Sequence, residues 1–270
     1  MKTVGFIGAG SMGGAILEGA LKRGGLAPSD ITVFDAWPAA LEKARAQGVR
    51  IAGSNAQVAA ASDLTILAVK PKDALAVLAE IKEALEGRAL LSIVAGLSSS
   101  AIRAALAGAG PSSARLLVTL PNTPLRAGEG ATGFALETTF TREEKDFARR
   151  LFEASGIVEW VPEKLLPAVS ALSGGGPAYA AMFVEALADG GVLEGLPRAT
   201  AYRLAAQTLK GAGALLLETG EHPGAVKDAV CSPGGTTIEA VRELERGAFR
   251  YAVMSAVSRS AEKFSRLLPV

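Results

Sequence analysis

The chain has 270 residues, a formal net charge of +1 and 49% hydrophobic residues, which is enough for one large domain or two ordinary ones with sizeable cores. Its lysines and arginines are scattered along the chain, so the composition gives no reason to expect nucleic acid or an anionic membrane surface as a partner. One cysteine, Cys231, excludes a disulfide within the chain and a CxxC metal site, and it fits the cytoplasmic location that we expect.

Residues 3–13 predict a strand, a glycine-rich turn and the start of a helix. The turn has the spacing G-x-G-x-x-G, with Gly8, Gly10 and Gly13. In dinucleotide-binding folds the first glycine makes the tight turn, the second admits the pyrophosphate and the third lets the helix pack against the strand. An Ala/Gly-rich turn of another α/β protein is the alternative. On the nucleotide interpretation, the cofactor-binding residues of this segment are Ile7, Gly8, Ala9, Gly10, Ser11 and Met12.

Asp35 follows the second predicted strand, residues 31–34, and lies 22 residues beyond Gly13. That spacing is typical of the carboxylate that binds the adenosine ribose. Such a carboxylate favours the free 2′-hydroxyl of NADH and repels the 2′-phosphate of NADPH. No arginine follows directly, since Ala36 and Trp37 come next. These residues therefore favour NADH.

Candidate strands alternate with alanine-rich amphipathic segments in the first part of the chain, which predicts a Rossmann-like, doubly wound and mainly parallel sheet. The strands are expected at 3–7, 31–34, 64–69, 89–95, 115–119, 131–136 and 156–161. Beyond these, helical segments punctuated by glycine and proline are expected at 164–188, 197–219, 222–231 and 236–267. We therefore predict a nucleotide-binding domain, residues 1–162, followed by an all-helical domain, residues 163–270.

The predicted helices of the second domain are too apolar to have one solvated face. Residues 178–184 and 212–217 leave little polar surface, and a helix that is apolar all round must be buried. We expect a homodimer, or a higher oligomer built from it, in which the helical domains pack together. The uncharged stretch 165–184 is not expected to span a membrane, because three glycines followed by Pro177 interrupt it.

Two loops that follow candidate strands carry further polar residues. In open α/β sheets, ligands bind beyond the carboxyl ends of the strands, so both loops should face the cofactor crevice. A solvated lysine and a turn asparagine are the alternatives. The cofactor candidates here are Ala68, Val69, Lys70, Pro71 and Asn122. Asparagine occurs only at 55 and 122, and glutamine only at 47, 57 and 207, a depletion that indicates a thermophilic source and that gives weight to the two asparagines that remain.

The segment 226–239 places two glycines and two threonines where a helix is expected to begin. The free N–H groups of a first helical turn, reinforced by the helix dipole, suit a small anion such as a carboxylate. Thr236 and Glu239 have the spacing of a capping box. A plain glycine-rich loop before a capped helix is the alternative. The substrate-binding candidates are Ser232, Gly234, Gly235, Thr236 and Thr237.

Together these segments resemble the pyrroline-5-carboxylate reductase family over essentially the whole chain. The motifs occur in the family's order: FIGAGSMGGAI at 6–16, AVKP at 68–71, PNTP at 121–124, LSGGGPAY at 172–179, LADGGVLEGLPR at 187–198, EHPG at 221–224 and KDAVCSPGGTTIEA at 227–240. The last block is the family's signature and is highly specific. One departure is Gly175, where the family usually has serine, so we assign no polar role to that position.

The resemblance implies NAD(P)H-dependent reduction of the cyclic imine 1-pyrroline-5-carboxylate to L-proline, the last step of proline biosynthesis, by hydride transfer to the imine carbon. Such a reaction needs a cofactor and an oriented, electrophilic imine, and no metal. Family members commonly use NADPH, whereas Asp35 favours NADH, so we expect both cofactors to be used.

The resemblance also implies the roles of particular residues. The substrate carboxylate would bind backbone N–H groups at 235–237 with Ser232 alongside, and the Thr237 hydroxyl would hydrogen-bond the ring nitrogen. Thr237 is therefore the most direct catalytic candidate. Lys70, the second candidate, would lie near the cofactor, and Asn55 near the adenosine ribose or its phosphate.

Two rival interpretations remain open. A β-hydroxyacid dehydrogenase pairs a lysine with an asparagine in its second domain; Lys210 can stand for the lysine, but no asparagine follows residue 122. A non-catalytic nucleotide sensor shares the fold, but it would not need the 232–237 segment. His222, the only histidine, is interpreted as part of a turn or helix start rather than as a catalytic group.

Overall fold

The computed structural model describes residues 1–108 and 110–266, which form two compact units. The first unit consists of Met1–Gly174 together with the segment that begins at Ser260, and the second consists of Gly175–Arg259. Among the described residues, no helix is both long and apolar enough to cross a membrane.

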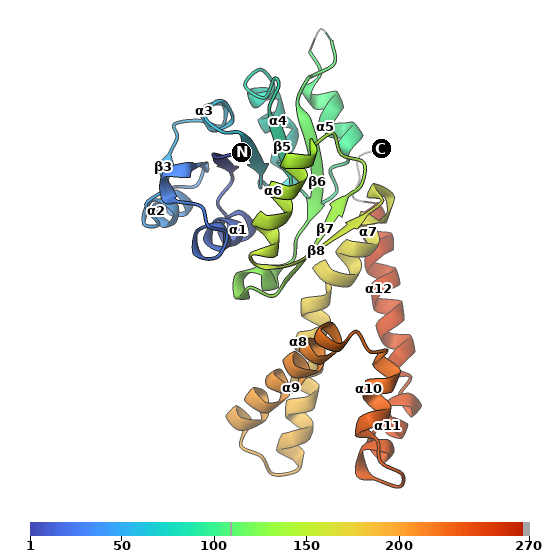
Figure 1. Ribbon diagram of the computed structural model, residues 1–270. Helices are drawn as coiled ribbons and strands as arrows, with labels where there is room; N and C mark the ends of the chain where they lie inside the picture. The colour runs from blue at the N-terminus through green and yellow to red at the C-terminus, as the bar shows by residue number, and fades with distance from the viewer. Residues whose placement is uncertain (109, 267–270) are drawn as a thin grey trace. The chain divides into compact units, whose positions relative to one another are not determined.

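One eight-stranded sheet organises the first unit, with the strand order β3-β2-β1-β4-β5-β6-β7-β8; Figure 1 labels β3 and β5 to β8. The six strands from β3 to β6 in this order are parallel to one another, β7 is antiparallel to β6, and β8 is parallel to β7. The predicted doubly wound, mainly parallel sheet is therefore confirmed. The strands are β1 Val4–Ile7, β2 Ile31–Phe34, β3 Arg50–Ile51, β4 Leu64–Leu67, β5 Ala89–Ser92, β6 Arg115–Leu120, β7 Gly130–Ala135 and β8 Gly156–Val161. The prediction missed β3, because two residues are too few to show a hydrophobic period.

Helices cover both faces of this sheet. Successive strand residues point to opposite faces, so Phe6 belongs to one buried apolar cluster and Ile7 to the other. Helices α1, α2 and α6 pack on the first cluster, whereas α3, α4 and α5 pack on the second. This double cover explains why the central strands are apolar without alternation. The helices are α1 Ser11–Lys22, α2 Pro38–Arg45, α3 Asn55–Ala60, α4 Pro71–Ile81, α5 Ser99–Leu106 and α6 Arg142–Glu153, with short 3-10 segments η1 Pro28–Asp30 and η2 Thr123–Ala127.

The chain beyond residue 162 continues to pack on the sheet. It forms η3 Glu163–Leu165, α7 Leu166–Val169 and the π-helical turn η4 Ser170–Gly174. Leu166 is buried in the same cluster as Val118 of β6, and a Cβ added to Gly133 of β7 would stand 2.8 Å from a methyl group of Val169. The first compact unit therefore extends to Gly174, and the predicted domain boundary between 162 and 163 stays a prediction.

Two of the four helical segments predicted in the second part of the chain are divided into shorter elements. The predicted interruption of 165–184 at its glycines is confirmed, since α7 and η4 precede it and α8 begins at Gly176. The segment 236–267 is broken at Gly247 and Ala248, where Ala248 adopts a left-handed φ of 53°. The predictions 197–219 and 222–231 are confirmed. The helices are α8 Gly176–Leu193, α9 Arg198–Thr219, α10 Pro223–Val230, α11 Thr236–Arg246 and α12 Phe249–Ser265.

The second unit buries few side chains. Its apolar cluster of buried residues is Ala188, Ala201 and Ala205, with Val184 and Val192 partly buried against it. Large apolar side chains are exposed instead, and Leu193 is 86% exposed. Contiguous exposed apolar surface marks an interaction site. Further exposed apolar side chains of this unit are Met182, Leu204, Leu215, Leu217, Tyr251 and Met254.

An ion pair inside the first unit joins β6 to α6. Glu144 is only 5% exposed, and its Oε1 lies 2.6 Å from Nη2 of Arg115. The Arg115 guanidinium also donates to the Gly87 carbonyl oxygen at 2.7 Å. Burial acts to raise the pKa of Glu144, but hydrogen bonds from Arg115 and from the Thr141 N–H outweigh it, so the pKa is lowered.

Replacing Glu144 with glutamine should lower the free energy of unfolding at neutral pH by about 2 kcal/mol, because the partly buried Arg115 loses its charged partner. The pKa of Glu144 is lowered from its ordinary value of 4.5, so the pair contributes fully above that value and its contribution is lost as pH falls through the folded-state pKa. Chemical denaturation of both proteins across this range measures the difference.

The matched control is Glu153→Gln, because Glu153 sits on the same helix in an exposed pair with Arg149. It should change the unfolding free energy by no more than about 0.5 kcal/mol. If the free energies of unfolding of the wild type and of Glu144→Gln differ by the same amount at acid pH as at neutral pH, the stabilising role of the ionised Glu144 is contradicted.

Candidate active site

Three glycines shape the loop between β1 and α1. Gly8 has a left-handed φ of 96°, and a Cβ there would stand 2.6 Å from the Ala68 carbonyl oxygen. A Cβ on Gly13 would stand 2.2 Å from the Gly8 carbonyl oxygen. At Gly10, by contrast, a Cβ would meet nothing within 4 Å among the described residues. The loop is thus closed by the protein at Gly8 and Gly13 and open at Gly10, which is the shape that admits a pyrophosphate.

The first turn of α1 adds N–H donors to this opening. Gly10 is the N-cap residue of α1, and in the described structure no side chain caps the helix. Ser11 and Met12 are its first two residues. Because uncapped N–H groups and the helix dipole both favour a negative charge, the residues predicted to bind the cofactor form a fitting cradle for a dinucleotide phosphate.

The Asp35 carboxylate connects this loop to the turn after β2. Its Oδ2 accepts a hydrogen bond from the Ala9 N–H at 2.7 Å, and its Oδ1 accepts one from the Trp37 N–H at 2.8 Å. The sequence predicted a ribose ligand here and gave no sign of this bracing role. Each carboxylate oxygen keeps a second lone pair, so the brace is compatible with a contact to a ribose hydroxyl.

The loop after β4 lies against the glycine-rich loop. The Ala68 N–H donates to the Ile7 carbonyl oxygen at 2.8 Å, so the structure brings these two predicted cofactor segments together. Val69 is partly buried, and Lys70 is the exposed N-cap residue of α4. Pro71 occupies the first position of α4, where a missing N–H costs nothing.

Both asparagines make hydrogen bonds within the first unit. Asn55, the first residue of α3, donates from Nδ2 to Oε2 of Glu80 at 2.7 Å. Asn122 is 7% exposed; its Oδ1 accepts from the Ala131 N–H at 2.8 Å, and its Nδ2 donates to the Ser173 carbonyl oxygen at 3.0 Å. Asn122 therefore fixes the turn after β6 to β7 and to η4. The cofactor contacts predicted for both residues stay predictions.

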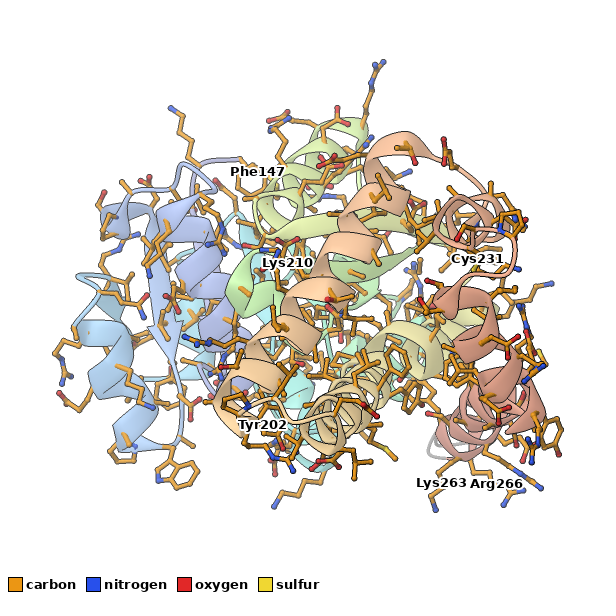
Figure 2. All side chains as sticks on the ribbon, turned by 90° about the horizontal axis from the view of Figure 1, so that it is seen from below. Phe147, Tyr202, Lys210, Cys231, Lys263 and Arg266 are labelled. Atoms are coloured by element: carbon orange, nitrogen blue, oxygen red, sulfur yellow. The ribbon has the colours of Figure 1, made fainter. Side chains whose placement is uncertain are left out.

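The loop between α10 and α11 carries the predicted substrate residues, all of them in the second unit. Cys231, labelled in Figure 2, opens this loop. Gly234 has a left-handed φ of 67°. The Gly235 N–H donates to the Ser232 carbonyl oxygen at 3.0 Å, and a Cβ on Gly235 would stand 2.3 Å from the Ser232 hydroxyl oxygen. Both glycines are therefore required by the turn itself.

The predicted capping box between Thr236 and Glu239 is wrong. Gly235 takes the N-cap position of α11, so Thr236 is the first helical residue. Glu239 pairs with Arg242 instead, at 2.6 Å. A glycine N-cap has no side-chain acceptor, and the N–H groups of the first turn are left for a ligand. Thr236 is exposed and Thr237 is partly buried beside them.

His222 has a structural role, as the sequence indicated. It is the N-cap residue of α10, and its Nδ1 accepts a hydrogen bond from the Gly224 N–H at 3.0 Å. The imidazole therefore acts as a helix cap at the start of α10, the helix that precedes the loop with the predicted substrate residues.

A cavity of about 430 Å³ lies beside the glycine-rich loop, between α1 and α2. Trp37, Lys43 and Arg126 line it, and none of them was predicted as a site residue. Trp37 is 74% exposed. The position of Trp37, shortly after the predicted strand 31–34 and directly before Pro38, could have marked it as a candidate. Nothing in the sequence connects Arg126 to this cavity.

Comparisons with known proteins place the chain in a family. Residues 163–267 match the family model described as "Pyrroline-5-carboxylate reductase dimerisation", and residues 3–96 match "NADP oxidoreductase coenzyme F420-dependent". The chain is 41% identical to the pyrroline-5-carboxylate reductases of Methanosarcina acetivorans and Escherichia coli, over 98% of this chain and 97% and 98% of theirs. The chain belongs to the pyrroline-5-carboxylate reductase family.

Solved pyrroline-5-carboxylate reductases share the architecture. The enzyme of Coxiella burnetii is 32% identical, with a TM-score of 0.92 over 100% of this chain and 99% of that one. The Plasmodium falciparum enzyme, solved with NADP bound, is 30% identical, with a TM-score of 0.85 over 98% and 97%. The chain thus belongs to a family of nicotinamide-dependent oxidoreductases. The two rival interpretations, a β-hydroxyacid dehydrogenase and a non-catalytic nucleotide sensor, are therefore rejected.

The departure from the reductase family at Gly175 lies at the start of α8. Gly175 is the N-cap residue of that helix, with a φ of −80°. Any residue adopts this conformation, so the backbone does not require the glycine that replaces the family's serine.

Replacing Gly10 with alanine should weaken nicotinamide-cofactor binding without destabilising the fold. The new methyl group meets open space in the protein but takes the room of the pyrophosphate, so we expect the Kd to rise about tenfold or more. Gly13→Ala is the comparison, because its clash with Gly8 should lower the Tm as well. Cofactor titration and thermal unfolding measure the two effects, and an unchanged Kd in Gly10→Ala would contradict the assignment.

Proposed function

We propose that the protein reduces 1-pyrroline-5-carboxylate to L-proline with a reduced nicotinamide cofactor. The observation that carries this proposal is the start of α11, where a glycine N-cap leaves the first-turn N–H groups free next to Thr236 and Thr237. In a chain of this family, that arrangement accounts for the carboxylate of the substrate. The open loop at Gly10 accounts for the cofactor.

The first step in the mechanism is binding of the substrate carboxylate. The backbone N–H groups of Thr236 and Thr237 donate to it, since the Gly235 N–H already bonds the Ser232 carbonyl oxygen, and the dipole of α11 stabilises its charge. Gly234, with its left-handed backbone conformation, turns the chain so that Ser232 lies next to the first turn of α11. Because two N–H groups hold the carboxylate, the imine ring is kept in one orientation. This orientation contributes most of the rate enhancement.

The second step is reduction of the C=N bond. When bound, the reduced nicotinamide supplies a hydride to the imine carbon, and the ring nitrogen ends as the amine of proline. The Thr237 hydroxyl hydrogen-bonds that nitrogen and guides its proton. A threonine hydroxyl is too weak an acid to supply the proton unaided, so the proton comes from water or is already on the imine.

The protein uses both NADH and NADPH under this proposal. The Asp35 carboxylate suits the ribose 2′-hydroxyl of NADH, and the Plasmodium falciparum relative was solved with NADP bound. Lys70 is exposed at the N-terminus of α4, next to the loop that contacts Ile7, and under this proposal it lies near the cofactor. The deciding experiment follows reduced-nicotinamide absorbance with 1-pyrroline-5-carboxylate and each cofactor separately. Substrate-dependent loss is expected with both; no loss with either, despite cofactor binding, would overturn the proposal.

Thr237→Ala should lower kcat/KM by about 5- to 30-fold, which corresponds to one lost hydrogen bond of about 1–2 kcal/mol in the transition state. Thr237→Ser keeps the hydroxyl and should restore most of the activity. Thr208→Ala, on α9, is the control, because the Thr208 hydroxyl only bonds the Leu204 carbonyl of its own helix. Steady-state kinetics of the three variants give the answer, and a fully active Thr237→Ala enzyme would remove this residue from the mechanism.

The protein also forms a homodimer through its second unit, in the cytoplasm, under this proposal. Support comes from the exposed apolar side chains of α8, α9 and α12, of which Leu193 is 86% and Leu217 71% exposed, and from the match to a dimerisation model. Sedimentation at micromolar concentration should show a dimer or a multiple of it. Leu217→Glu should shift the protein towards the monomer; a monodisperse wild-type monomer would refute the assembly.

A further inference from the structure

The cavity between α1 and α2 adjoins the glycine-rich loop and the turn after β2. It begins at Gly10 and Ser11 of the glycine-rich loop and measures about 430 Å³. Trp37, the N-cap residue of α2, forms part of its wall. Asp35 lies two residues earlier and accepts hydrogen bonds from the Ala9 N–H of the glycine-rich loop and from the Trp37 N–H of its own turn. Since Ala9 and Trp37 both line the cavity, a group on the 2′-oxygen of a ribose bound by Asp35 would lie beside it.

The charges around the cavity favour an anion. Lys43 of α2 and Arg126 of η2 line it, and among the described residues neither pairs with an acid. The acid of the lining, Glu18, is bound by Lys22 at 2.6 Å. The hydrogen bond and the charge of Lys22 lower the pKa of Glu18, so this carboxylate is already neutralised by a neighbour on its own helix.

We propose that this cavity binds the adenosine 2′-phosphate of NADPH, with Lys43 and Arg126 as the specificity-determining residues. The proposal rests on the proposed function and adds the basis of its dual cofactor use. Asp35 alone would repel a 2′-phosphate, but the two cations that line the cavity offset that repulsion. The two backbone N–H groups that donate to Asp35 further spread its charge.

Cofactor choice then comes from two separate elements. The ribose hydroxyls of NADH hydrogen-bond Asp35 at the end of β2. The extra phosphate of NADPH binds Lys43 of α2 and Arg126 of η2, the turn after β6. Removing the two cations should therefore weaken the binding of NADPH and leave the binding of NADH unchanged.

The test uses the adenosine halves of the two cofactors, 2′,5′-ADP and ADP, titrated by calorimetry into the full chain without substrate. The double variant Lys43→Gln/Arg126→Gln should bind 2′,5′-ADP about tenfold or more weakly, with ADP affinity changed by less than about twofold. The kcat/KM ratio of NADPH to NADH should fall by a similar factor. Arg45→Gln is the matched control, because Arg45 lies on the same helix, pairs with Glu42 and is not part of the cavity wall.

Three outcomes have distinct meanings. A double variant that binds 2′,5′-ADP as the wild type does would overturn the proposal, and so would an equal loss of ADP binding, since the loss would then not be specific to the phosphate. A selective loss in the double variant, but not in Arg45→Gln, supports it. Because binding is measured without the imine, absence of turnover would refute the proposed reaction and leave this result unaffected.

Trp37 offers a second readout at the same place. The chain has two tryptophans, and the other, Trp160, packs against Phe134 with ring centroids 5.1 Å apart. In a Trp160→Phe background, 2′,5′-ADP should therefore change the fluorescence of Trp37 alone. A saturating addition that leaves this fluorescence unchanged would place the phosphate elsewhere.

Discussion

The close approach of α1 to the loop that precedes it is the constraint on which the first unit depends. Gly13 lies so near the Gly8 carbonyl oxygen that no side chain fits between them, and Gly8 itself needs a left-handed backbone. This approach aims the first turn of α1 at the opening at Gly10. It also places Ile16 and Leu17 in the apolar cluster on one face of the sheet. The same contact thus shapes the loop that we propose to hold the cofactor phosphates and fixes a core helix.

The sequence predicted the elements that depend on local pattern and missed those that depend on neighbouring loops. The strands of the parallel sheet were predictable because both faces are buried, so their residues form continuous apolar runs. The bracing role of Asp35 was not predictable, because it depends on how two loops, 26 positions apart in sequence, approach each other. Arg126 reaches the cavity for a similar reason, through a turn that follows a strand on the far side of β5.

The errors at the start and end of α11 have related causes. Thr236 and Glu239 matched a capping pattern, but Gly235 occupied the N-cap position and Glu239 paired along the helix with Arg242. At the other end, Gly247 closes the helix and Ala248 turns the chain before α12. In both places the sequence pattern was compatible with more than one helix boundary, and a glycine, Gly235 or Gly247, forms the boundary in the structure. The residues proposed to bind the substrate come from the signature block, whereas the geometry of their loop could not be predicted from it.

The sparse core of the second unit has a consequence for how the protein responds to dilution. Its buried cluster consists of three alanines, which is little apolar burial for helices of this length. In the proposed homodimer, most of the burial that orders these helices would then come from the other copy, and the stability of this unit would follow mass action rather than temperature alone. Lowering the protein concentration would loosen α11 and its loop while the sheet, with its own two cores, stays folded. Specific activity measured at high dilution would then report on the association equilibrium as much as on the chemistry.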